Sequence, residues 1–393
     1  MSNPNINEAI TLMVSFAERT GLTGDHAPRR YLWTDAFAVC NFLGLAQTTS
    51  EHRYTELALK LVDQVHHTLG RHRDDDPRSG WLSGLNDQDG ENHPTRGGLR
   101  IGKSLPERAP GEDYDERLEW DRDGQYFHYL TKWMHALDQV AFATGEPRYN
   151  LWARELAKTA HQAFTFLTPA GMRRMHWKMS IDLTRTLIPS MGQHDPLDGY
   201  ITCLELQATA AALPTTNAEP NLADELNQLA AMVEDGGWTT SDPLGIGGLL
   251  TDAQRVDDLL HRGAISDQQL RDELLAAALS GLRYYAVSGE LRRPADYRLA
   301  FRELGLAIGL QSIEPMWQIV NDDSSHSSTS PELRAQLQAL REYVPLRNDI
   351  ESVWRNPEHH RSTAWSEHRD INEVMLATCL VPEGFLVTSA LNP

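Results

Sequence analysis

Cysteine, positive charge and long apolar runs are all scarce in this sequence of 393 residues. The three cysteines, Cys40, Cys203 and Cys379, lie far apart in apolar segments and show no CxxC spacing. A sparse, odd set of this kind excludes a disulfide framework and is typical of reduced core thiols. We therefore expect a cytoplasmic protein.

The shortage of basic residues limits the possible partners. Lys and Arg number 36 against 55 Asp and Glu, which gives a formal net charge of −19. This balance argues against a nucleic-acid backbone or an anionic membrane surface as partner. No apolar run approaches the roughly 18 residues that a membrane span needs. The opening residues, MSNPNINEAI, show no basic region followed by an apolar one, so we expect no signal peptide.

Strand patterns are also rare, whereas helical periodicity is present throughout, in two kinds of segment. The first kind is amphipathic. In residues 52–69 the apolar side chains from Tyr54 to Leu69 recur every three or four positions and leave Lys60 and Asp63 off the stripe. We expect similar helices with one exposed face at 5–19, 147–166, 221–233, 267–287 and 331–343.

The second kind is apolar nearly all round. Residues 31–45 read YLWTDAFAVCNFLGL, and a helix with that pattern is buried on several sides. Comparable segments begin near residues 123, 198, 245, 297 and 370. The two kinds alternate along the chain, which predicts an all-α fold: an (α/α)6 barrel, or toroid, with six inner and six outer helices.

A helical solenoid would also alternate helix pairs, but its repeat length should be steady. Here the intervals between inner helices vary, which favours a toroid with long loops on one face. No low-complexity linker divides the chain, so we expect a single domain over residues 1–393. The sequence does not indicate an oligomeric state.

Three long inserts, residues 71–122, 168–197 and 344–369, each lead into the start of an inner helix. In a ring of antiparallel helix pairs this gathers them on one face. They hold much of the Trp, His and Arg of the chain. Aromatic rings mixed with charged groups at a concave end are typical of a small-molecule site.

These residue types suit a carbohydrate, whose apolar C–H faces stack on aromatic rings. Hydrolysis of a glycosidic bond needs two carboxylates, one to protonate the leaving oxygen and one to activate water or attack carbon. Candidates at equivalent levels of the predicted ring are Asp35, Glu119, Asp121, Asp123, Asp195, Asp198, Asp252, Glu303, Glu367, Asp370 and Glu373.

Some of these acids also have a structural interpretation. Asp123, Asp198 and Asp370 lie where helices are expected to start, and Asp is a favoured N-cap. Asp35 lies inside an apolar run, where an acid is costly unless it is paired or faces a cavity. Glu303 lies in a similar run, with Arg298 and Arg302 near enough in sequence to pair with it.

Two other motifs do not predict a bound group. The segment GGLRIGKS (97–104) matches the string of a phosphate-binding loop, but no strand precedes it and Pro106 interrupts any helix after it. His359 and His360 are adjacent and no HExxH spacing exists. We therefore expect no cofactor and no metal.

The segment DGQYFHYLTKW (123–133) resembles the Gly-Gln-aromatic start of an inner helix in unsaturated-uronide hydrolases. With the alternation of helices, the chain resembles the six-hairpin (α/α)6 glycosidase-like superfamily. That superfamily includes glycoside hydrolases and, on a related barrel, N-acylglucosamine 2-epimerases. In the uronide hydrolases, Asp residues near two inner helix starts carry acid–base catalysis, which implies Asp35 and Asp123 as their counterparts here.

Three hypotheses follow. In the first, a glycoside hydrolase acting on a small or oligomeric sugar uses Asp123 or Asp121 as the acid and Asp35 or Glu367 to direct water. Trp81, Trp120, Trp177 and Trp365 would stack on the sugar, Arg100 and Arg173 would meet an anionic group, and His128 and Asp198 would complete the substrate site. In the second, a sugar epimerase or isomerase uses His176, His194 or His368 to exchange a carbon-bound proton. In the third, the toroid only binds sugar or protein.

Overall fold

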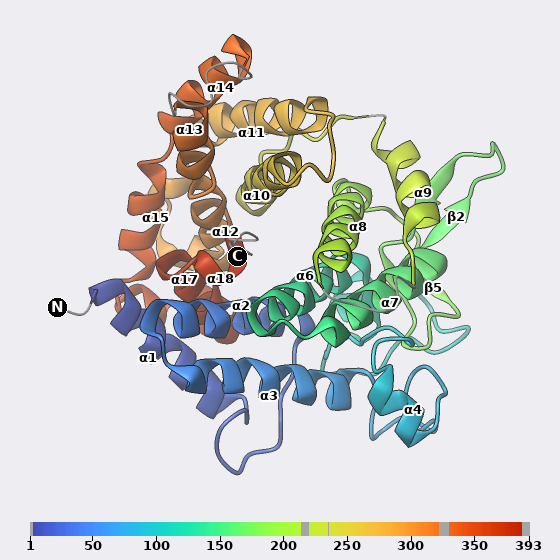
Figure 1. Cartoon of the computed structure of the whole chain (residues 1–393). Coiled ribbons are helices and arrows are strands. Elements are labelled where there is room, and N and C mark those ends of the chain that lie inside the picture. Colours follow the sequence, from blue (N-terminus) through green and yellow to red (C-terminus); the bar gives the residue numbers. More distant parts are fainter. Residues whose placement is uncertain (1–2, 214–219, 235, 322–329, 387–393) are drawn as a thin grey trace. The chain divides into compact units, whose positions relative to one another are not determined.

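The computed structural model describes residues 3–213, 220–234, 236–321 and 330–386, and its elements are labelled in Figure 1. The chain divides into two compact units. We call residues 17–235 the N-terminal unit, and residues 1–16 together with 236–393 the C-terminal unit. The expectation of one domain over residues 1–393 stays a prediction.

The N-terminal unit is built on three helix pairs. Each pair joins a helix that is buried nearly all round to an amphipathic one: α2 (Leu32–Thr49) with α3 (His52–Leu69), α6 (Phe127–Thr144) with α7 (Pro147–Phe164), and α8 (Asp195–Ala212) with α9 (Ala223–Val233). The buried helices also pack on one another, α2 on α6 and α6 on α8. They are therefore the inner helices of this unit.

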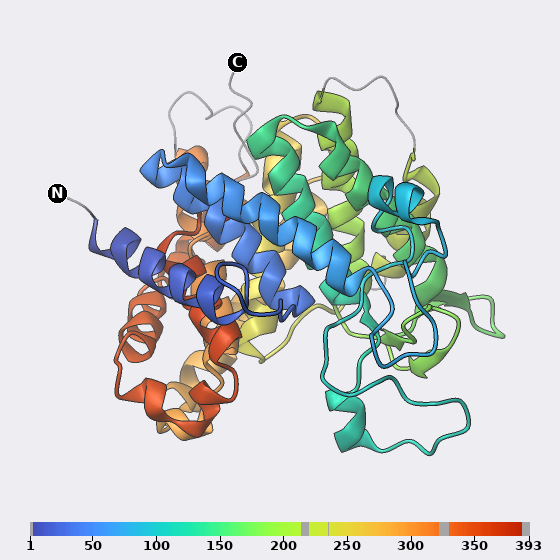
Figure 2. The ribbon, with the colours of Figure 1, turned by 90° about the horizontal axis from the view of Figure 1, so that it is seen from below.

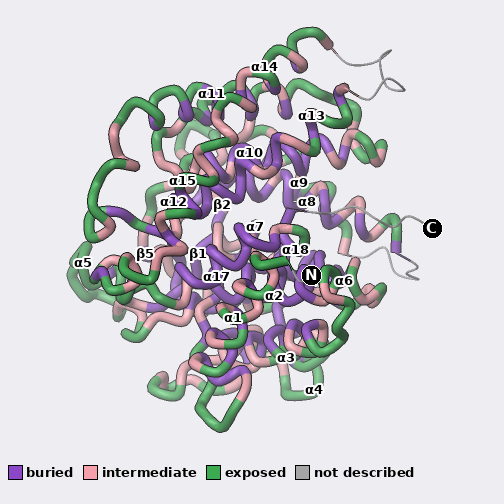
Figure 3. Tube along the Cα trace, turned by 90° about the vertical axis from the view of Figure 1, so that its left-hand side faces the viewer, coloured by how far each residue is buried: buried purple, intermediate pink, exposed green. Residues whose placement is uncertain are grey.

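The all-round apolar pattern explains why α2 is an inner helix. Every residue from Leu32 to Leu45 is buried, whereas α3 keeps an exposed face that includes Lys60 and Asp63. Figure 3 shows the same contrast in colour along the chain. Helices that are apolar on all sides need packing partners on all sides, so the sequence pattern alone distinguishes the inner helices from the outer ones.

The few strands of the unit lie in the second insert or directly beside the first two inserts. Two short helices, α4 (Asp87–Asn92) and α5 (Glu116–Asp121), lie in the first insert, which Figure 2 shows as a group of loops beside α3. Strands β1 (Gln125–Tyr126), β4 (Lys178–Met179) and β5 (Thr186–Ile188) form one antiparallel sheet. A hairpin joins β2 (Thr165–Leu167) to β3 (Arg173–Met175). The sheet thus ties the second insert to the residues that begin α6.

The C-terminal unit follows the same principle. Its inner helices are α10 (Pro243–His261), α12 (Ala300–Leu310) and α17 (Arg369–Leu380), with α10 packed on α12 and α12 on α17. The outer layer contains most of α1 (Pro4–Arg19), α11 (Gln269–Ser288), α13 (Ile313–Asn321), α14 (Pro331–Arg341) and α15 (Leu346–Trp354). Short helices α16 (Thr363–Ser366) and α18 (Glu383–Leu386) flank α17.

Glycines allow α10 and α12 to approach closely. A Cβ atom added at Gly247 would lie 2.1 Å from the carbonyl oxygen of Gly305, and one at Gly309 would lie 2.4 Å from that of Gly247. No side chain fits at such distances. The helices therefore cross backbone to backbone, which explains the glycines in two otherwise apolar segments.

The positions of the helices agree closely with the sequence patterns, with two corrections. The third insert, expected as a loop over 344–369, contains the helices α15 and α16. Asp123, Asp198 and Asp370 are not N-caps, because Tyr126, His194 and His368 occupy those positions. Within the described part of the chain, no helix is both long and apolar enough to cross a membrane.

Candidate active site

In the N-terminal unit, the starts of the inner helices α2, α6 and α8 meet. The hydroxyls of Tyr31, the N-cap of α2, and Tyr129 of α6 lie 2.7 Å apart. His128 of α6 faces Asp195, the first residue of α8, with 3.9 Å between Nδ1 and Oδ1. The expected convergence of inner helix starts therefore holds within this unit.

The C-terminal unit shows the same arrangement at the starts of α10, α12 and α17. Arg302 forms an ion pair with Asp242 at 2.9 Å, and the backbone amide of Phe301 donates to the side chain of Asn372 at 3.0 Å. His368, which the sequence predicted as a substrate residue, contacts the ring of Phe301 here.

Aromatic rings surround the contact between α6 and α8. We call Tyr31, Trp33, Tyr126, His128, Tyr129 and Trp177 the aromatic cluster. His128 lies at its centre, with ring centroids 4.8 Å from Tyr129, 5.3 Å from Tyr126 and 6.3 Å from Trp177. Trp177 comes from the second insert and is placed by β4, which pairs with β1 beside Tyr126. The cluster thus joins two inner helices to an insert.

The carboxyl group of Asp195 at this place has a raised pKa. Its residue is 6% exposed, and its Oδ2 atom is buried without a hydrogen-bond partner. Burial raises the pKa of this carboxyl to about 7, and the nearby negative charge of Asp198 adds to the rise. A carboxylic acid that keeps its proton near neutral pH can act as a general acid.

Asp198 lies one turn further along α8 in a different environment. Its two carboxylate oxygens each lie 3.0 Å from Nζ of Lys132, and one also accepts a hydrogen bond from the hydroxyl of Thr131. A neighbouring cation and a hydrogen-bond donor both stabilise the charged form of a carboxylate. The first turn of α8 therefore presents two acids in different environments: Asp195, whose pKa burial raises, and Asp198, which is held by a cation and a hydroxyl.

His128 is held neutral at physiological pH. Burial lowers its pKa to about 4, and Lys132 acts in the same direction, while Asp198 opposes them. Its Nδ1 atom is buried without a hydrogen-bond partner. A neutral imidazole beside a carboxyl of raised pKa completes a set of groups that can exchange protons.

Asp123, by contrast, is a structural anchor. It is fully buried, and one of its oxygens accepts from the backbone amides of Gly102 and Lys103 at 3.0 and 3.3 Å. The other oxygen pairs with Arg100 at 2.5 Å and with Arg73 at 3.4 Å. Both oxygens are occupied, which disfavours the expected acid role. The amides that a phosphate loop would offer to a ligand at GGLRIGKS bind this carboxylate instead.

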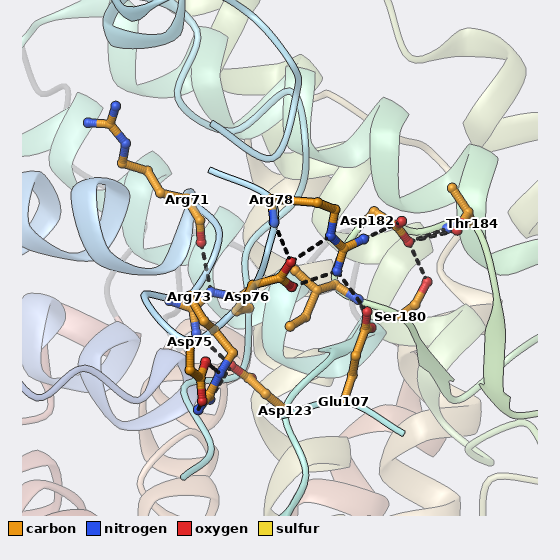
Figure 4. A network of polar contacts seen from close by, with 12 residues as sticks. Arg71, Arg73, Asp75, Asp76, Arg78, Glu107, Asp123, Ser180, Asp182 and Thr184 are labelled. Atoms are coloured by element: carbon orange, nitrogen blue, oxygen red, sulfur yellow. Dashed lines mark hydrogen bonds and ion pairs between the residues drawn. The ribbon is translucent and has the colours of Figure 1, made fainter. Parts of the chain in front are cut away.

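A network of ion pairs next to Asp123 fixes the first insert to the second (Figure 4). The guanidinium of Arg78 binds three carboxylates, those of Asp76, Glu107 and Asp182, at 2.5 to 2.9 Å. Glu107 also accepts from the backbone amide of Ile181. Since Asp182 and Ile181 follow β4 directly, the network holds the segment that carries Trp177.

Asp35 has a local structural role as well. Its Oδ2 accepts from the backbone amide of Tyr31 at 2.9 Å, and its Oδ1 accepts from Arg30 at 3.3 Å. An acid on the first turn that reaches back to the N-cap amide closes the start of the helix. A buried acid is costly unless it is paired, and Asp35 is paired with Arg30 and with the amide of Tyr31. These contacts favour a structural role over catalysis.

Other predicted residues of the N-terminal unit lie outside the aromatic cluster. Arg100 is buried against Asp123, Trp81 is buried beneath Arg71 beside a separate cavity, and Arg173 donates to Thr165. His176 stacks on Phe166 with centroids 4.2 Å apart. Among the predicted residues, the structure brings together His128, Trp177, His194 and Asp198. The exposed ring of Trp120 contacts Trp177, and Asp121, also exposed, follows Trp120 in sequence.

The remaining predicted residues belong to the C-terminal unit. Trp365 is buried in a stack between His360 and Trp354, with centroids 3.9 and 5.7 Å away, so it is a core residue. Glu367 is exposed at the end of α16. Neither residue contacts a second candidate acid in the described structure.

Sequence reasoning placed Asp195 among eleven candidate acids but did not select it for catalysis. Its position before Pro196 at a helix start gives no hint of the missing hydrogen-bond partner or of the neighbouring Asp198 charge. The tyrosines of the cluster were missed too, because they read as ordinary apolar positions of inner helices. The polar stripe of His128 and Lys132 on α6 was the signal that could have found this site.

Known structures of similar fold exist, although no protein-family profile and no curated protein sequence matches the chain. A GH76 α-mannanase from Bacteroides thetaiotaomicron aligns with a TM-score of 0.54 over 97% of this chain and 96% of that chain, at 9% identity. The chain has the (α/α)6 toroid fold. The predicted all-α class and toroid architecture are confirmed.

Two sugar-converting enzymes align with the toroid less well. A sugar epimerase from a ruminal bacterium has a TM-score of 0.45, with 10% identity and 86% of each chain covered. A cellobiose 2-epimerase from Spirochaeta thermophila has a TM-score of 0.47, with 10% identity, over 94% of this chain and 97% of that chain. At such identities the likeness concerns the fold alone.

Proposed function

We propose that this toroid is a carbohydrate-active enzyme that hydrolyses glycosidic bonds with Asp195 and Asp198. The observation that carries the proposal is the unequal state of two acids on one helix turn. Burial raises the pKa of Asp195 to about 7, while Lys132 and Thr131 stabilise the charge of Asp198. Glycoside hydrolysis needs one acid of each kind. The fold shared with an α-mannanase is consistent with this proposal.

In this mechanism Asp195 gives its proton to the glycosidic oxygen as the bond from that oxygen to the anomeric carbon breaks. Asp198 stabilises the positive charge that develops on the sugar ring and either accepts a proton from water or attacks the carbon. Water supplies the new hydroxyl group. If Asp198 attacks the carbon, the proton that water loses returns to Asp195; if Asp198 instead accepts that proton, Asp198 releases it to solvent and Asp195 regains a proton from solvent. Trp177, which is partly exposed, provides a ring on which the sugar stacks.

The proposal is tested by measuring release of reducing ends from α-mannan and from a panel of oligosaccharides, including uronic-acid oligomers. Asp195→Asn and Asp198→Asn should each lower kcat/KM at least about 100-fold, the lower range for loss of general acid–base catalysis. Asp113→Asn, an exposed acid in the first insert, is the matched control and should have no effect. If Asp121→Asn or Glu367→Asn abolishes hydrolysis and Asp195→Asn does not, the proposed assignment is wrong.

A second candidate function rests on His128. Its imidazole, neutral because its pKa is lowered to about 4, lies 3.9 Å from Asp195, an arrangement that could move a carbon-bound proton in a sugar epimerase. Incorporation of solvent deuterium into a reducing sugar, without cleavage of any glycosidic bond, would favour this function. Loss of that exchange in His128→Gln would identify the base.

A further inference from the structure

Trp120 is an exposed ring joined to the aromatic cluster. Its residue is 49% exposed, although the ring contacts Trp177 edge to face with centroids 5.7 Å apart. Trp177 in turn lies 6.3 Å from His128, which contacts Asp195. A continuous series of ring contacts therefore leads from an exposed tryptophan to the buried acid.

The helix that carries Trp120 is held firmly in spite of its short length. Glu119, the preceding residue, is 1% exposed and forms ion pairs with Lys178 at 2.9 Å and with Arg108 at 3.1 Å. Lys178 also donates to the backbone carbonyls of Glu119 and Arg122, each at 2.8 Å. The chain is thus fixed on both sides of Trp120.

The same lysine also fixes Trp177, because the two residues are adjacent in sequence at the start of β4. Lys178 is fully buried, and its ammonium group also lies 5.5 Å from the ring centroid of Tyr126. One buried ion therefore sets the relative positions of both tryptophans. An exposed aromatic ring on a rigid support binds a ligand without the entropic cost of ordering it.

We infer that Trp120 forms a distal sugar subsite, so that the substrate is an oligosaccharide chain extending from Asp195 past Trp177 to Trp120. This inference rests on the proposed function and adds the substrate class: a chain of several sugar units rather than a single sugar or a disaccharide. A sugar unit at the reacting bond meets Trp177, and a remote unit covers the exposed face of Trp120.

The test compares Trp120→Ala with the wild-type protein on p-nitrophenyl α-mannoside and on α-linked manno-oligosaccharides of increasing length, or on the series of whichever sugar of the panel is cleaved. For the wild type, kcat/KM should rise with chain length. Trp120→Ala should lose roughly tenfold on the longer chains, as expected for a tryptophan at the centre of a contact, and almost nothing on the shortest glycoside. Tyr284→Ala removes an exposed ring from α11 and serves as the control.

A second readout does not depend on turnover. In the Asp195→Asn background, longer oligosaccharides should shift the fluorescence of Trp120, and the shift should vanish in the double variant with Trp120→Phe. If sugars are cleaved but Trp120→Ala affects all chain lengths equally, or none, the distal subsite is refuted while the proposed function stands. If no sugar is cleaved or bound, the proposed function itself fails.

Discussion

Replacing Asp195 with Asn should make the protein more stable at alkaline pH. In the folded chain the pKa of this carboxyl is about 7, against 3.8 for a free side chain. A difference of about three units corresponds to at most ~4 kcal/mol of unfolding free energy. Since Asn has nearly the same size and carries no charge, it keeps the packing against Gly192 and removes the cost of ionisation.

The sign of the effect follows from the raised pKa. The folded protein holds a proton that the unfolded chain releases, so this carboxyl stabilises the folded state below pH 4 and loses that contribution as pH rises towards 7. Between pH 5 and pH 8 the wild type should therefore lose about 2 to 3 kcal/mol relative to Asp195→Asn.

The assay is urea unfolding of both proteins at pH 5 and pH 8. The quantity compared is the difference in unfolding free energy between Asp195→Asn and the wild type at pH 8, minus the same difference at pH 5. Effects of titrating groups that do not interact with Asp195 cancel in that quantity, because both proteins contain them. The matched exposed variant Asp113→Asn should show no pH-dependent difference. A stability difference between Asp195→Asn and the wild type that is equal at pH 5 and pH 8 would refute the raised pKa and, with it, the role of general acid.

Three further predictions concern buried ion pairs, whose disruption typically costs about 3 to 5 kcal/mol. Asp123→Asn should lower the urea midpoint by leaving Arg100 unpaired, yet the folded fraction should keep its kcat for any sugar that is cleaved. Glu119→Gln should destabilise the first insert by weakening its bond to Lys178, and limited proteolysis should then cut near residue 120 faster than in the wild type. Glu303→Gln should lower the melting temperature by several degrees, because this carboxylate pairs with a buried arginine and a tryptophan, and it should leave sugar binding unchanged.

The sequence predicted the helices well because the distribution of apolar residues within each segment determines how far its helix is buried. The inner helices α2 and α10 begin at Leu32 and Pro243, close to the expected starts near 32 and 245. Helices in the third insert were missed. The segment of α15 is only nine residues long, so its amphipathic stripe, which includes Ile350 and Trp354, is short.

The candidate site was predicted less well, since the role of an acid depends on its partners in space. Asp123 and Asp195 both lie near the start of an inner helix, and the residues around them in sequence do not distinguish the two. Asp123 meets Arg100 from a loop that precedes it by 23 residues, whereas Asp195 meets the imidazole of His128, 67 residues away. Only the fold shows that the carboxylate of Asp123 is paired with arginine, whereas the carboxyl of Asp195 has no cation of its own among the described residues and has a raised pKa.

The most direct test of the account is the dependence of each variant on the leaving group. The dinitrophenolate group of a dinitrophenyl glycoside departs without protonation, so cleavage of this substrate does not need a general acid. Asp195→Asn should therefore retain near wild-type kcat/KM on this substrate while losing activity on an unactivated glycoside, and Asp198→Asn should be inactive on both. Equal losses of Asp195→Asn on the two substrates would contradict the assignment of Asp195 as the acid.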